Sequence, residues 1–371
     1  MRKSSMPYLI ILLAAAVLAV SGCGKQTGNS AQESVLTQNT QTAAEPFSQT
    51  SFKLDTVVTV TLYDSQDQDI LTHCIDLCDE YEKIFSRTKE DSELYRLNHR
   101  LLPTMKGTAD TYEISQPLSE LLSAALSYST ETDGAFDAAI APLSSLWDFH
   151  DEEPSVPPAD DIQAAVEKCG YEGVTVQGQT VTLPSPDTEF DLGAIAKGYI
   201  ADRMKEYLLS QGIKSAVISL GGNVLCVGEK LSGDSFKIGI QKPFADRNET
   251  IAIMEIKDKS VVSSGIYERY FEQGGKLYHH ILNPRTGYPY DNGLVSVTII
   301  CDKSVDGDAL STSCFALGLE KGLEYLQSLD DVQGVFITSD YELHYTENFS
   351  ENIRMIPTDT GYASLPSDSK K

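Results

Sequence analysis

Apolar and polar positions follow two different periods along this chain, and each period predicts a different kind of element. The run Thr56–Tyr63 (TVVTVTLY) is rich in β-branched residues and predicts a strand. Apolar residues at helical spacing predict helices at Asp69–Ile84 and Pro117–Thr130. The same reasoning predicts a short helix through Cys169 capped by Gly170, helices at Ile195–Ser210 and Asp308–Leu319, a hairpin of Ala216–Leu220 and Val224–Gly228, strands between Lys237 and Ile300, and a strand at Val335–Ile337. The mixture, without any repeat at solenoid spacing, indicates an α+β domain.

The first 23 residues have the pattern of an export signal, and we expect them to lie outside the fold. Arg2 and Lys3 precede an apolar run, Tyr8–Val20, of about 13 residues, which is too short to span a bilayer. The run ends in Ser-Gly-Cys23, which resembles a bacterial lipobox in which Cys23 carries the lipid. An ordinary signal peptide with an incidental cysteine is the alternative, and both predict export.

These patterns predict four parts of the chain. We expect a lipoprotein signal peptide at 1–22, a disordered tether at 23–50, the globular domain at 51–357 and a polar tail at 358–371. The tether is expected because Gln, Ser, Thr, Asn and Ala dominate it without apolar periodicity. The predicted location is the outer face of the cell membrane, through a lipid anchor, or the periplasm.

Composition narrows the possible partners. The 371 residues carry a formal net charge of −25. Nucleic-acid binding needs a concentrated basic face, so this charge argues against it. Six cysteines remain besides Cys23, none in repeated CxxC pairs with zinc-like spacing, and we expect them to be small buried apolar residues.

Two segments in the second half carry candidate phosphate chemistry. Asp191-Leu-Gly-Ala-Ile-Ala-Lys197-Gly198 is predicted where a strand turns into a helix, and a helix start offers free N–H groups to an anion. A lysine in the first turn of a helix is unfavourable for the helix itself, so Lys197 suggests an anionic partner; the alternative is a solvated lysine beside Asp191. His279 and His280 precede the turn Asn-Pro-Arg-Thr-Gly, and in a strand they point to opposite faces, so only one enters a given pocket. The alternative for that histidine is a hydrogen-bonded structural role.

A third segment, Asp306-Gly-Asp308-Ala-Leu-Ser311-Thr312, offers oxygen ligands. Asp308 and Thr312 are spaced i, i+4 and share one side of a helix. Carboxylate and hydroxyl oxygens suit Mg²⁺, while the alternative is a helix N-cap by Asp306 or Asp308. No GxSxG or HExxH motif occurs in the sequence, which leaves phosphate chemistry as the common theme.

Taken together, these segments resemble the ApbE family, the FAD:protein FMN transferases. The resemblance runs from about Leu54 to Ile337 and rests on many motifs in order: DTVVTVTLY, FSRTKEDSELYRLN, TDGAFDAAIAPLSSLWDF, DLGAIAKGYIAD, SLGGNVLCVG, SSGIYERYF, HHILNPRTGYP and DGDALSTSCFALG. It implies an α+β fold of the ApbE type (T-fold-like), with a mixed sheet and helices in two closely packed lobes. It also implies FAD as the donor substrate, Mg²⁺ as cofactor and an acceptor flavoprotein with a Thr or Ser target.

The resemblance implies roles for individual residues. The metal ligands would be Ala194 through its carbonyl, Asp308 and Thr312, with Ser311 nearby where some relatives have aspartate. The catalytic histidine would be His280. The residues implied to contact FAD are Asp191, Lys197, Thr88, Ala135, Phe136, Asp137, Ile281 and Leu54, the last of which stands where many relatives carry methionine.

The expected reaction is Mg-dependent transfer of FMN from FAD to a Thr or Ser hydroxyl of an exported or membrane-anchored flavoprotein, with release of AMP. Three alternatives stay open at this stage. One is hydrolysis of FAD to FMN and AMP by the same residues. The others are a non-catalytic flavin-binding lipoprotein and a solute-binding lipoprotein, neither of which needs the Asp308/Thr312 pair.

Overall fold

The computed structural model describes residues 45–149, 151–246, 248–349, 353–358 and 361–362. Its strands are β1 (Phe47–Lys53), β2 (Thr56–Leu62), β3 (Thr111–Glu113), β4 (Thr175–Gln177), β5 (Thr180–Thr182), β6 (Ser215–Leu220), β7 (Asn223–Gly228), β8 (Phe236–Gln241), β9 (Thr250–Ile256), β10 (Ser260–Gly265), β11 (Tyr270–Gln273), β12 (Lys276–His279), β13 (Leu294–Cys301), β14 (Gln333–Thr338), β15 (Leu343–Tyr345) and β16 (Arg354–Pro357). Its helices are α1 (Gln68–Phe85), α2 (Glu93–Asn98), α3 (Gln116–Glu131), α4 (Ala141–Ser144), α5 (Ala159–Val166), α6 (Ala196–Ser210), α7 (Ser304–Leu317) and α8 (Leu319–Gln327).

One large sheet organises these elements. Eight strands pair in the order β1-β2-β6-β7-β10-β13-β14-β15. The expected mixed sheet is antiparallel in every strand pair of the described residues. Smaller sheets are β16-β9-β8, β3-β5-β4 and the hairpin β11-β12. The α+β class is confirmed.

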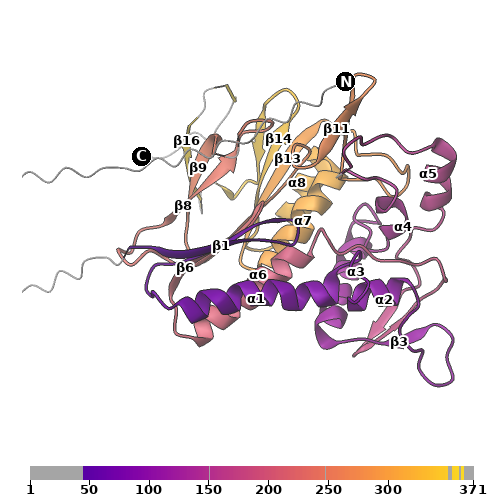
Figure 1. Ribbon diagram of the computed structural model, residues 1–371. Coiled ribbons are helices and arrows are strands. Elements are labelled where there is room, and N and C mark those ends of the chain that lie inside the picture. The colour runs from indigo at the N-terminus through magenta and orange to yellow at the C-terminus, as the bar shows by residue number, and fades with distance from the viewer. Residues whose placement is uncertain (1–44, 150, 247, 350–352, 359–360, 363–371) are drawn as a thin grey trace, which may run out of the picture. The chain divides into compact units, whose positions relative to one another are not determined.

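Helices cover one face of the large sheet and a small sheet covers the other (Figure 1). Apolar side chains of β2, β6 and β7 pack against α1, α3 and α6, and those of β13 and β14 pack against α7 and α8. On the opposite face, β8 and β9 bury their apolar side chains against other positions of β7, β10, β13 and β14. This arrangement follows from the alternation of side chains along each strand, which gives both sheet faces an apolar layer.

The helices α6 and α7 lie against each other and carry residues central to the candidate site. Gly198 in α6 permits this approach, because a Cβ atom there would lie 2.2 Å from the backbone oxygen of Ser304. The carboxylate of Asp202 in α6 accepts hydrogen bonds from the amides of Ser304 (2.8 Å) and Val305 (2.9 Å), at the start of α7. An aspartate in the neighbouring helix therefore caps α7.

Several sequence predictions need correction. The predicted tether at 23–50 overlaps β1, which begins at Phe47 because Phe47–Lys53 pairs residue by residue with β2. The described residues all belong to one compact unit, Ala43–Lys371, so the two lobes expected from the sequence pack closely enough to form a single unit. Tyr362, placed in the polar tail, is buried and packs against the ring of Tyr341.

Two predicted helix boundaries also differ. α7 begins at Ser304 rather than Asp308, since Asp202 supplies its cap, and α5 ends at Val166, before Cys169. The predicted signal peptide and Cys23 lie outside the described residues. Within the described part of the chain, no helix combines the length and apolar character needed to cross a membrane.

Candidate active site

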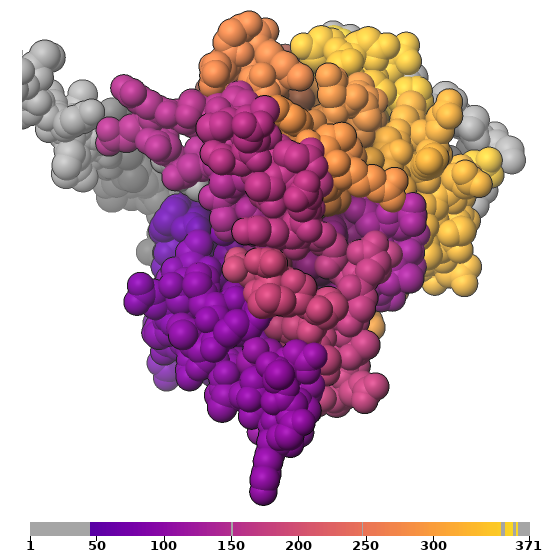
Figure 2. All heavy atoms as spheres, turned by 90° about the vertical axis from the view of Figure 1, so that its right-hand side faces the viewer, coloured from indigo at the N-terminus to yellow at the C-terminus, as the bar shows by residue number. Residues whose placement is uncertain are grey.

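A cavity of about 470 Å³ lies where segments from both halves of the chain meet. Its lining includes the β1–β2 turn, the end of α1, residues 135–149, the start of α6, the end of β10 and part of α7. In the space-filling view, the magenta and pink surface of residues near 140–200 meets the orange surface of residues near 280–300 (Figure 2). Hydrogen bonds join these halves; in two of them Trp147 Nε1 donates to the oxygen of Gly287 (3.0 Å) and the Tyr290 hydroxyl donates to the oxygen of Ala135 (2.9 Å). The cavity therefore needs the folded chain as a whole.

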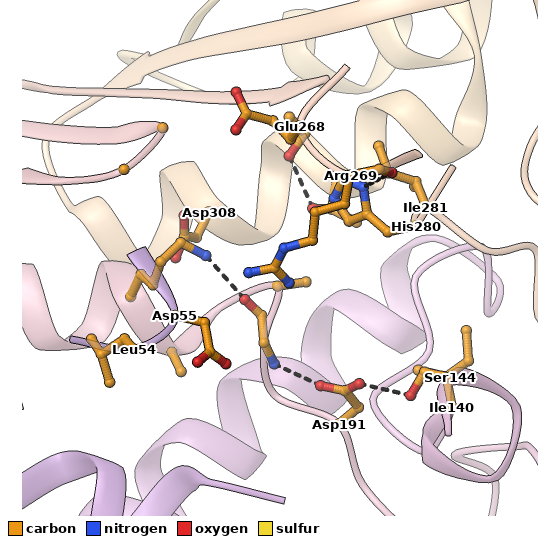
Figure 3. Close-up of a pocket in the computed structure, with 18 of the residues that line it drawn as sticks. Leu54, Asp55, Ile140, Ser144, Asp191, Glu268, Arg269, His280, Ile281 and Asp308 are labelled. Atoms are coloured by element: carbon orange, nitrogen blue, oxygen red, sulfur yellow. Dashed lines mark hydrogen bonds between the residues drawn. The ribbon is translucent and has the colours of Figure 1, made fainter. Parts of the chain in front are cut away.

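The β1–β2 turn presents a strained tip to this cavity. Leu54 and Asp55 form its two-residue loop, with φ angles of 54° and 55°. Two consecutive residues with positive φ match a type I′ hairpin, which ordinarily favours Asn-Gly. Leucine there costs on the order of 1 kcal/mol or more, and such strain is typical of ligand-contacting segments. Figure 3 shows both residues at the cavity.

Asp191 is held rigidly at the opposite side of the cavity. Its carboxylate pairs with Arg87 Nε (2.9 Å) and accepts a hydrogen bond from the amide of Gly193 (2.9 Å). It also accepts one from the hydroxyl of Ser144 (2.7 Å), which Figure 3 shows. In the structure, no strand precedes Asp191: residues 183–195 form a loop, so the predicted strand-to-helix turn is wrong. The three contacts of Asp191 fix this loop and position the residues that follow it.

Positive side chains enter the cavity from separate elements. Lys197, in the first turn of α6, donates to the oxygen of Gly193 (3.2 Å), and Arg269 follows β10. Figure 3 shows the guanidinium of Arg269 reaching toward the centre of the cavity. Six carboxylates also line the cavity, those of Asp55, Glu82, Asp137, Asp191, Glu268 and Asp308, against three cations, those of Arg87, Lys197 and Arg269. A diphosphate entering here would meet more negative than positive charge, unless a further cation accompanied it.

Asp308 is a buried carboxylate with well-defined partners. Its Oδ2 accepts from the amide of Gly198 (2.6 Å) and its Oδ1 accepts from Nδ2 of Asn223 (3.1 Å). The alternative of a helix N-cap by Asp306 or Asp308 is wrong, because α7 begins at Ser304 and both residues lie inside the helix; Asp308 accepts its bonds from outside α7. Burial raises the pKa of Asp308, while Lys197, Asn223 and the Gly198 amide act in the opposite direction.

A chain of buried polar groups supports Asp308 from behind. The side-chain oxygen of Asn223 accepts from the hydroxyl of Ser304 (2.7 Å), which in turn accepts from the hydroxyl of Ser260 (3.0 Å). Asn223, Ser304 and Ser260 are all fully buried. Each member of this network is satisfied, so the Asn223 amide is fixed with its donor toward Asp308.

The oxygen atoms near Asp308 fit a magnesium ion that keeps other ligands. Thr312 and Ala194 line the same cavity as Asp308. Ser311 does not: it is fully buried, and its hydroxyl contacts Ser264 (2.8 Å) and the oxygen of Asp308 (3.0 Å). Among the described residues, no group of three or more His, Cys, Asp or Glu side chains could hold a metal. One carboxylate with neutral oxygens suits Mg²⁺, which typically completes its octahedron with water and substrate phosphates.

His280 and His279 have different environments, as their alternation predicts. His279 is buried, its Nε2 donates to the oxygen of Tyr290 (2.9 Å), and its Nδ1 accepts from the amide of Ile281 (3.3 Å). Burial lowers its pKa to about 4, which fits a neutral structural residue. His280 lines the cavity, and its Nδ1 lies 3.3 Å from the oxygen of Arg269. A carbonyl only accepts, so Nδ1 carries the proton and Nε2 stays free to accept another.

The electrostatics keep the His280 imidazole neutral. Burial is the largest cause that lowers its pKa, and the charges of Arg269 and Lys197 act in the same direction. A neutral imidazole with one free nitrogen is what a general base requires.

The remaining lining is largely apolar and suits planar rings. It includes Ala135, Phe136, Ile140, Trp147, Phe149 and Ile281, with the hydroxyl-bearing Thr88 at the end of α1. Asp137 lies among them, accepts from the amide of Ala139 (2.8 Å), and has its pKa raised to about 6 by burial. Concave apolar walls with a few polar groups are typical of cofactor-sized ligands.

The cavity thus brings together nearly all residues singled out in the sequence. His280, Leu54, Thr88, Ala135, Phe136, Asp137, Asp191, Lys197, Ile281, Ala194, Asp308 and Thr312 line it, and Ser311 lies behind it. Sequence reasoning missed Arg87 and Arg269. Each lies inside a quoted motif, FSRTKEDSELYRLN for Arg87 and SSGIYERYF for Arg269, but nothing in its local pattern separates it from a solvated arginine.

Comparisons with known proteins agree on one family. A protein-family model, described as the ApbE family, matches residues 54–336 of this chain. An FAD:protein FMN transferase of Klebsiella pneumoniae (strain 342) is 38% identical over 318 residues, which are 85% of this chain and 96% of that protein. One of Treponema pallidum (strain Nichols) is 33% identical over 296 residues, 76% of this chain and 80% of that protein.

Solved structures give the same result. The flavin transferase ApbE from Vibrio cholerae matches with a TM-score of 0.74 and 26% identity, over 83% of this chain and 99% of that chain. The ApbE protein from Thermotoga maritima matches with a TM-score of 0.74 and 29% identity, also over 83% and 99%.

Proposed function

The chain belongs to the ApbE family and is a transferase, and from this premise we propose that it moves FMN from FAD to a Thr or Ser hydroxyl of another protein. The observation that carries the proposal is the single cavity in which a free histidine nitrogen, two cations and the Asp308/Thr312 oxygens converge beside an apolar wall. Relatives named FAD:protein FMN transferase, up to 38% identical in the comparisons above, support FAD as the substrate.

The reaction is a phosphoryl transfer. The acceptor oxygen forms a bond to the phosphorus of the FMN half, and the bond between that phosphorus and the bridging oxygen breaks. AMP leaves with the electron pair on its phosphate oxygen, and the hydroxyl proton passes to Nε2 of His280. FMN remains joined to the acceptor through a phosphoester.

This chain's residues hold the reacting groups in place. The ammonium of Lys197 and the guanidinium of Arg269 bind non-bridging oxygens of the diphosphate. The carbonyl of Arg269 orients the His280 ring so that Nε2 faces the incoming hydroxyl. The apolar wall around Phe136 and Trp147 excludes water from the ring-binding side, which favours the protein hydroxyl as the acceptor.

Mg²⁺ would be held by Asp308, Thr312 and the carbonyl of Ala194. When bound, it would neutralise charge on the diphosphate. The excess of carboxylates over cations in the lining supports the proposal that a bound cation accompanies the diphosphate. We also propose that the protein is exported and lipid-anchored through Cys23, so that its acceptor is an exported or membrane-anchored flavoprotein.

The experiment uses the wild-type protein and its Asp308→Asn variant with FAD, Mg²⁺ and a candidate acceptor. Mass spectrometry should find the mass of one FMN added to the acceptor, together with stoichiometric AMP, only with the wild type. Release of AMP and free FMN without modified acceptor would identify hydrolysis instead. Undiminished transfer by Asp308→Asn at low Mg²⁺ would refute the metal assignment.

A further inference from the structure

The strand β10 runs alongside α7 and presents every second side chain to it. The hydroxyl of Ser260 donates to that of Ser304 at the start of α7 (3.0 Å). Ser264 lies four residues further along β10 and points the same way, because side chains in a strand alternate between its two faces. Its hydroxyl reaches α7 about two turns later, where it contacts the hydroxyls of Ser311 (2.8 Å) and Thr312 (3.1 Å). Ser264 therefore links two neighbouring hydroxyls of one helix.

The protons of these hydroxyls can be placed in one way that satisfies every contact. A hydroxyl has one proton to donate and two lone pairs that accept. The hydroxyl of Ser311 donates to the backbone oxygen of Asp308 (3.0 Å), which can only accept. Ser311 must therefore accept from Ser264, and Ser264, whose proton is then used, must accept from Thr312. We call Thr312, Ser264 and Ser311 the hydroxyl relay, since their protons all point in one direction, away from Thr312.

One end of the hydroxyl relay lies in the cavity and the other lies behind it. Thr312 and Ser264 line the cavity together with Asp308, whereas Ser311 is fully buried outside it. A hydroxyl that donates its proton to a neighbour keeps both lone pairs free for another partner. A cation binds such an oxygen through a lone pair and is repelled by a proton that points toward it. The hydroxyl relay therefore prepares the Thr312 oxygen for a cation held beside Asp308.

We infer that Ser264 is a positioning residue for the bound cation, an inference that rests on the proposed function because it takes Thr312 as a metal ligand. Ser264 acts by accepting the Thr312 proton. Outer partners that orient a metal ligand typically change metal affinity about 10–100-fold when they are removed. Ser311 lies outside the cavity, so its side chain influences the cation only through Ser264. A hydroxyl that cannot touch the metal should thus contribute to its affinity.

The test measures Mn²⁺ binding to the protein with FAD and without acceptor, from the electron paramagnetic resonance signal of the free ion. Mn²⁺ accepts the same oxygen ligands as Mg²⁺, and FAD without protein is the blank. Ser264→Ala removes the acceptor of the Thr312 proton and should weaken Mn²⁺ binding about 10-fold. Ser311→Ala frees the Ser264 proton to turn toward Thr312, and should weaken Mn²⁺ binding in the same direction but by less.

Combined substitutions distinguish the hydroxyl relay from a loss of packing. Thr312→Val removes the hydroxyl and keeps the shape, and in this background Ser264→Ala should cause no further loss of affinity. The double variant Ser264→Ala/Ser311→Ala should bind Mn²⁺ as Ser264→Ala does, because both changes interrupt the same path.

Ser263→Ala is the matched control for the strand. Ser263 is the neighbour of Ser264 in β10 and points to the other face, where its hydroxyl contacts that of Thr298 on β13 (2.8 Å). The substitution also breaks a bond between two hydroxyls, but not one that reaches α7. It should leave the affinity for Mn²⁺ unchanged, and thermal midpoints of both serine variants show that each is folded.

Several results would overturn the role of Ser264. They are an unchanged affinity in Ser264→Ala, an equally large loss in Ser263→Ala, and a full effect of Ser264→Ala in the Thr312→Val background. If the wild type with FAD binds no Mn²⁺, the metal part of the proposed function fails and the hydroxyl relay fails with it. If Mn²⁺ affinities follow the expected pattern while no acceptor is flavinylated, the hydroxyl relay stands and the proposed transfer fails, so the two failures are distinguishable.

Discussion

Replacing Gly198 with alanine tests how closely the site depends on the contact between α6 and α7. The added Cβ would lie 2.2 Å from the oxygen of Ser304 and 2.6 Å from Cα of Val305. Both are backbone atoms, so the two helices must separate. Separation also lengthens the 2.6 Å bond between the Gly198 amide and Asp308.

The magnitude follows from three contributions. Overpacking a well-packed contact costs about 1–3 kcal/mol. Loss of a hydrogen bond to a buried carboxylate costs about 1.5–3 kcal/mol. Alanine in a helix returns about 1 kcal/mol relative to glycine. The variant should therefore lose about 1.5–5 kcal/mol of unfolding free energy, which lowers the thermal midpoint by several degrees.

The assay combines chemical denaturation with calorimetric titration of Mg²⁺ in the presence of FAD. Gly198→Ala should lose stability and also bind Mg²⁺ more weakly, since Asp308 shifts with α7. Gly307→Ala is the control: its Cβ meets only the side chains of Val262 (2.7 Å) and Cys301 (3.2 Å), which can move more easily. If Gly198→Ala were no less stable than Gly307→Ala, the close contact would not hold the site together.

Three further predictions concern the polar groups of the site. His280→Asn should retain FAD binding, measured by flavin fluorescence, but lose about 10²–10⁴-fold in transfer rate. Because the pKa of His280 is lowered, kcat/KM of the wild type should fall only below pH 6.5 as the solution is acidified. A fall that begins above pH 7 would contradict the role of His280 as the base. Asn223→Ala removes the amide that orients Asp308 and should weaken Mg²⁺ binding about 10–100-fold in calorimetry, whereas unchanged affinity would show that the buried network has no influence on the metal. His279 should lower the stability of the protein in acid, because the unfolded chain takes up a proton below pH 6.5 while the folded state does not until about pH 4. In urea titrations, the unfolding free energy of the wild type relative to His279→Gln should fall by about 2 kcal/mol between pH 7 and pH 5. A pH-independent difference would mean that His279 is charged or exposed in the folded state.

Much of the fold follows from local sequence patterns. The helices α1, α3 and α6 begin and end within two residues of their predicted bounds, because apolar spacing and capping residues are local signals. The strands β6 and β7 also begin and end within two residues of their predicted bounds, because Gly221 and Gly222 indicate the turn between them. The order of strands in the large sheet could not be predicted in this way, because β10 joins β7 to β13 through contacts between distant parts of the chain.

The start of α7 shows why a boundary prediction fails. An aspartate followed by a helical segment is a good N-cap signal, and Asp306 and Asp308 both have it. The structure uses Asp202, about a hundred residues earlier, to bind the first amides of α7. Sequence spacing carries no information about a cap from another helix, so α7 begins four residues before the predicted start.

The candidate residues could be found in the sequence because they lie in recognisable motifs. The residues that orient them through hydrogen bonds and ion pairs could not be found in this way. Asp308 and Lys197 lie in recognisable segments, yet the Asn223 amide and the Arg87–Asp191 ion pair arise only from tertiary contacts. Arg269 illustrates the limit, since its carbonyl matters as much as its guanidinium, and a backbone atom has no signature in a sequence. The physical reason in each case is that orientation depends on neighbours from other elements.

The reciprocal bonds between α6 and α7 bear on when during its synthesis this protein can first capture flavin. Asp202 completes the start of α7, and Gly198 offers its amide to Asp308, so neither half of the pair exists without the other. A nascent chain that ends before residue 304 contains every ring-binding residue but no carboxylate partner for Gly198. Such a nascent chain should not bind FAD until the ribosome has added the last fifth of the polypeptide.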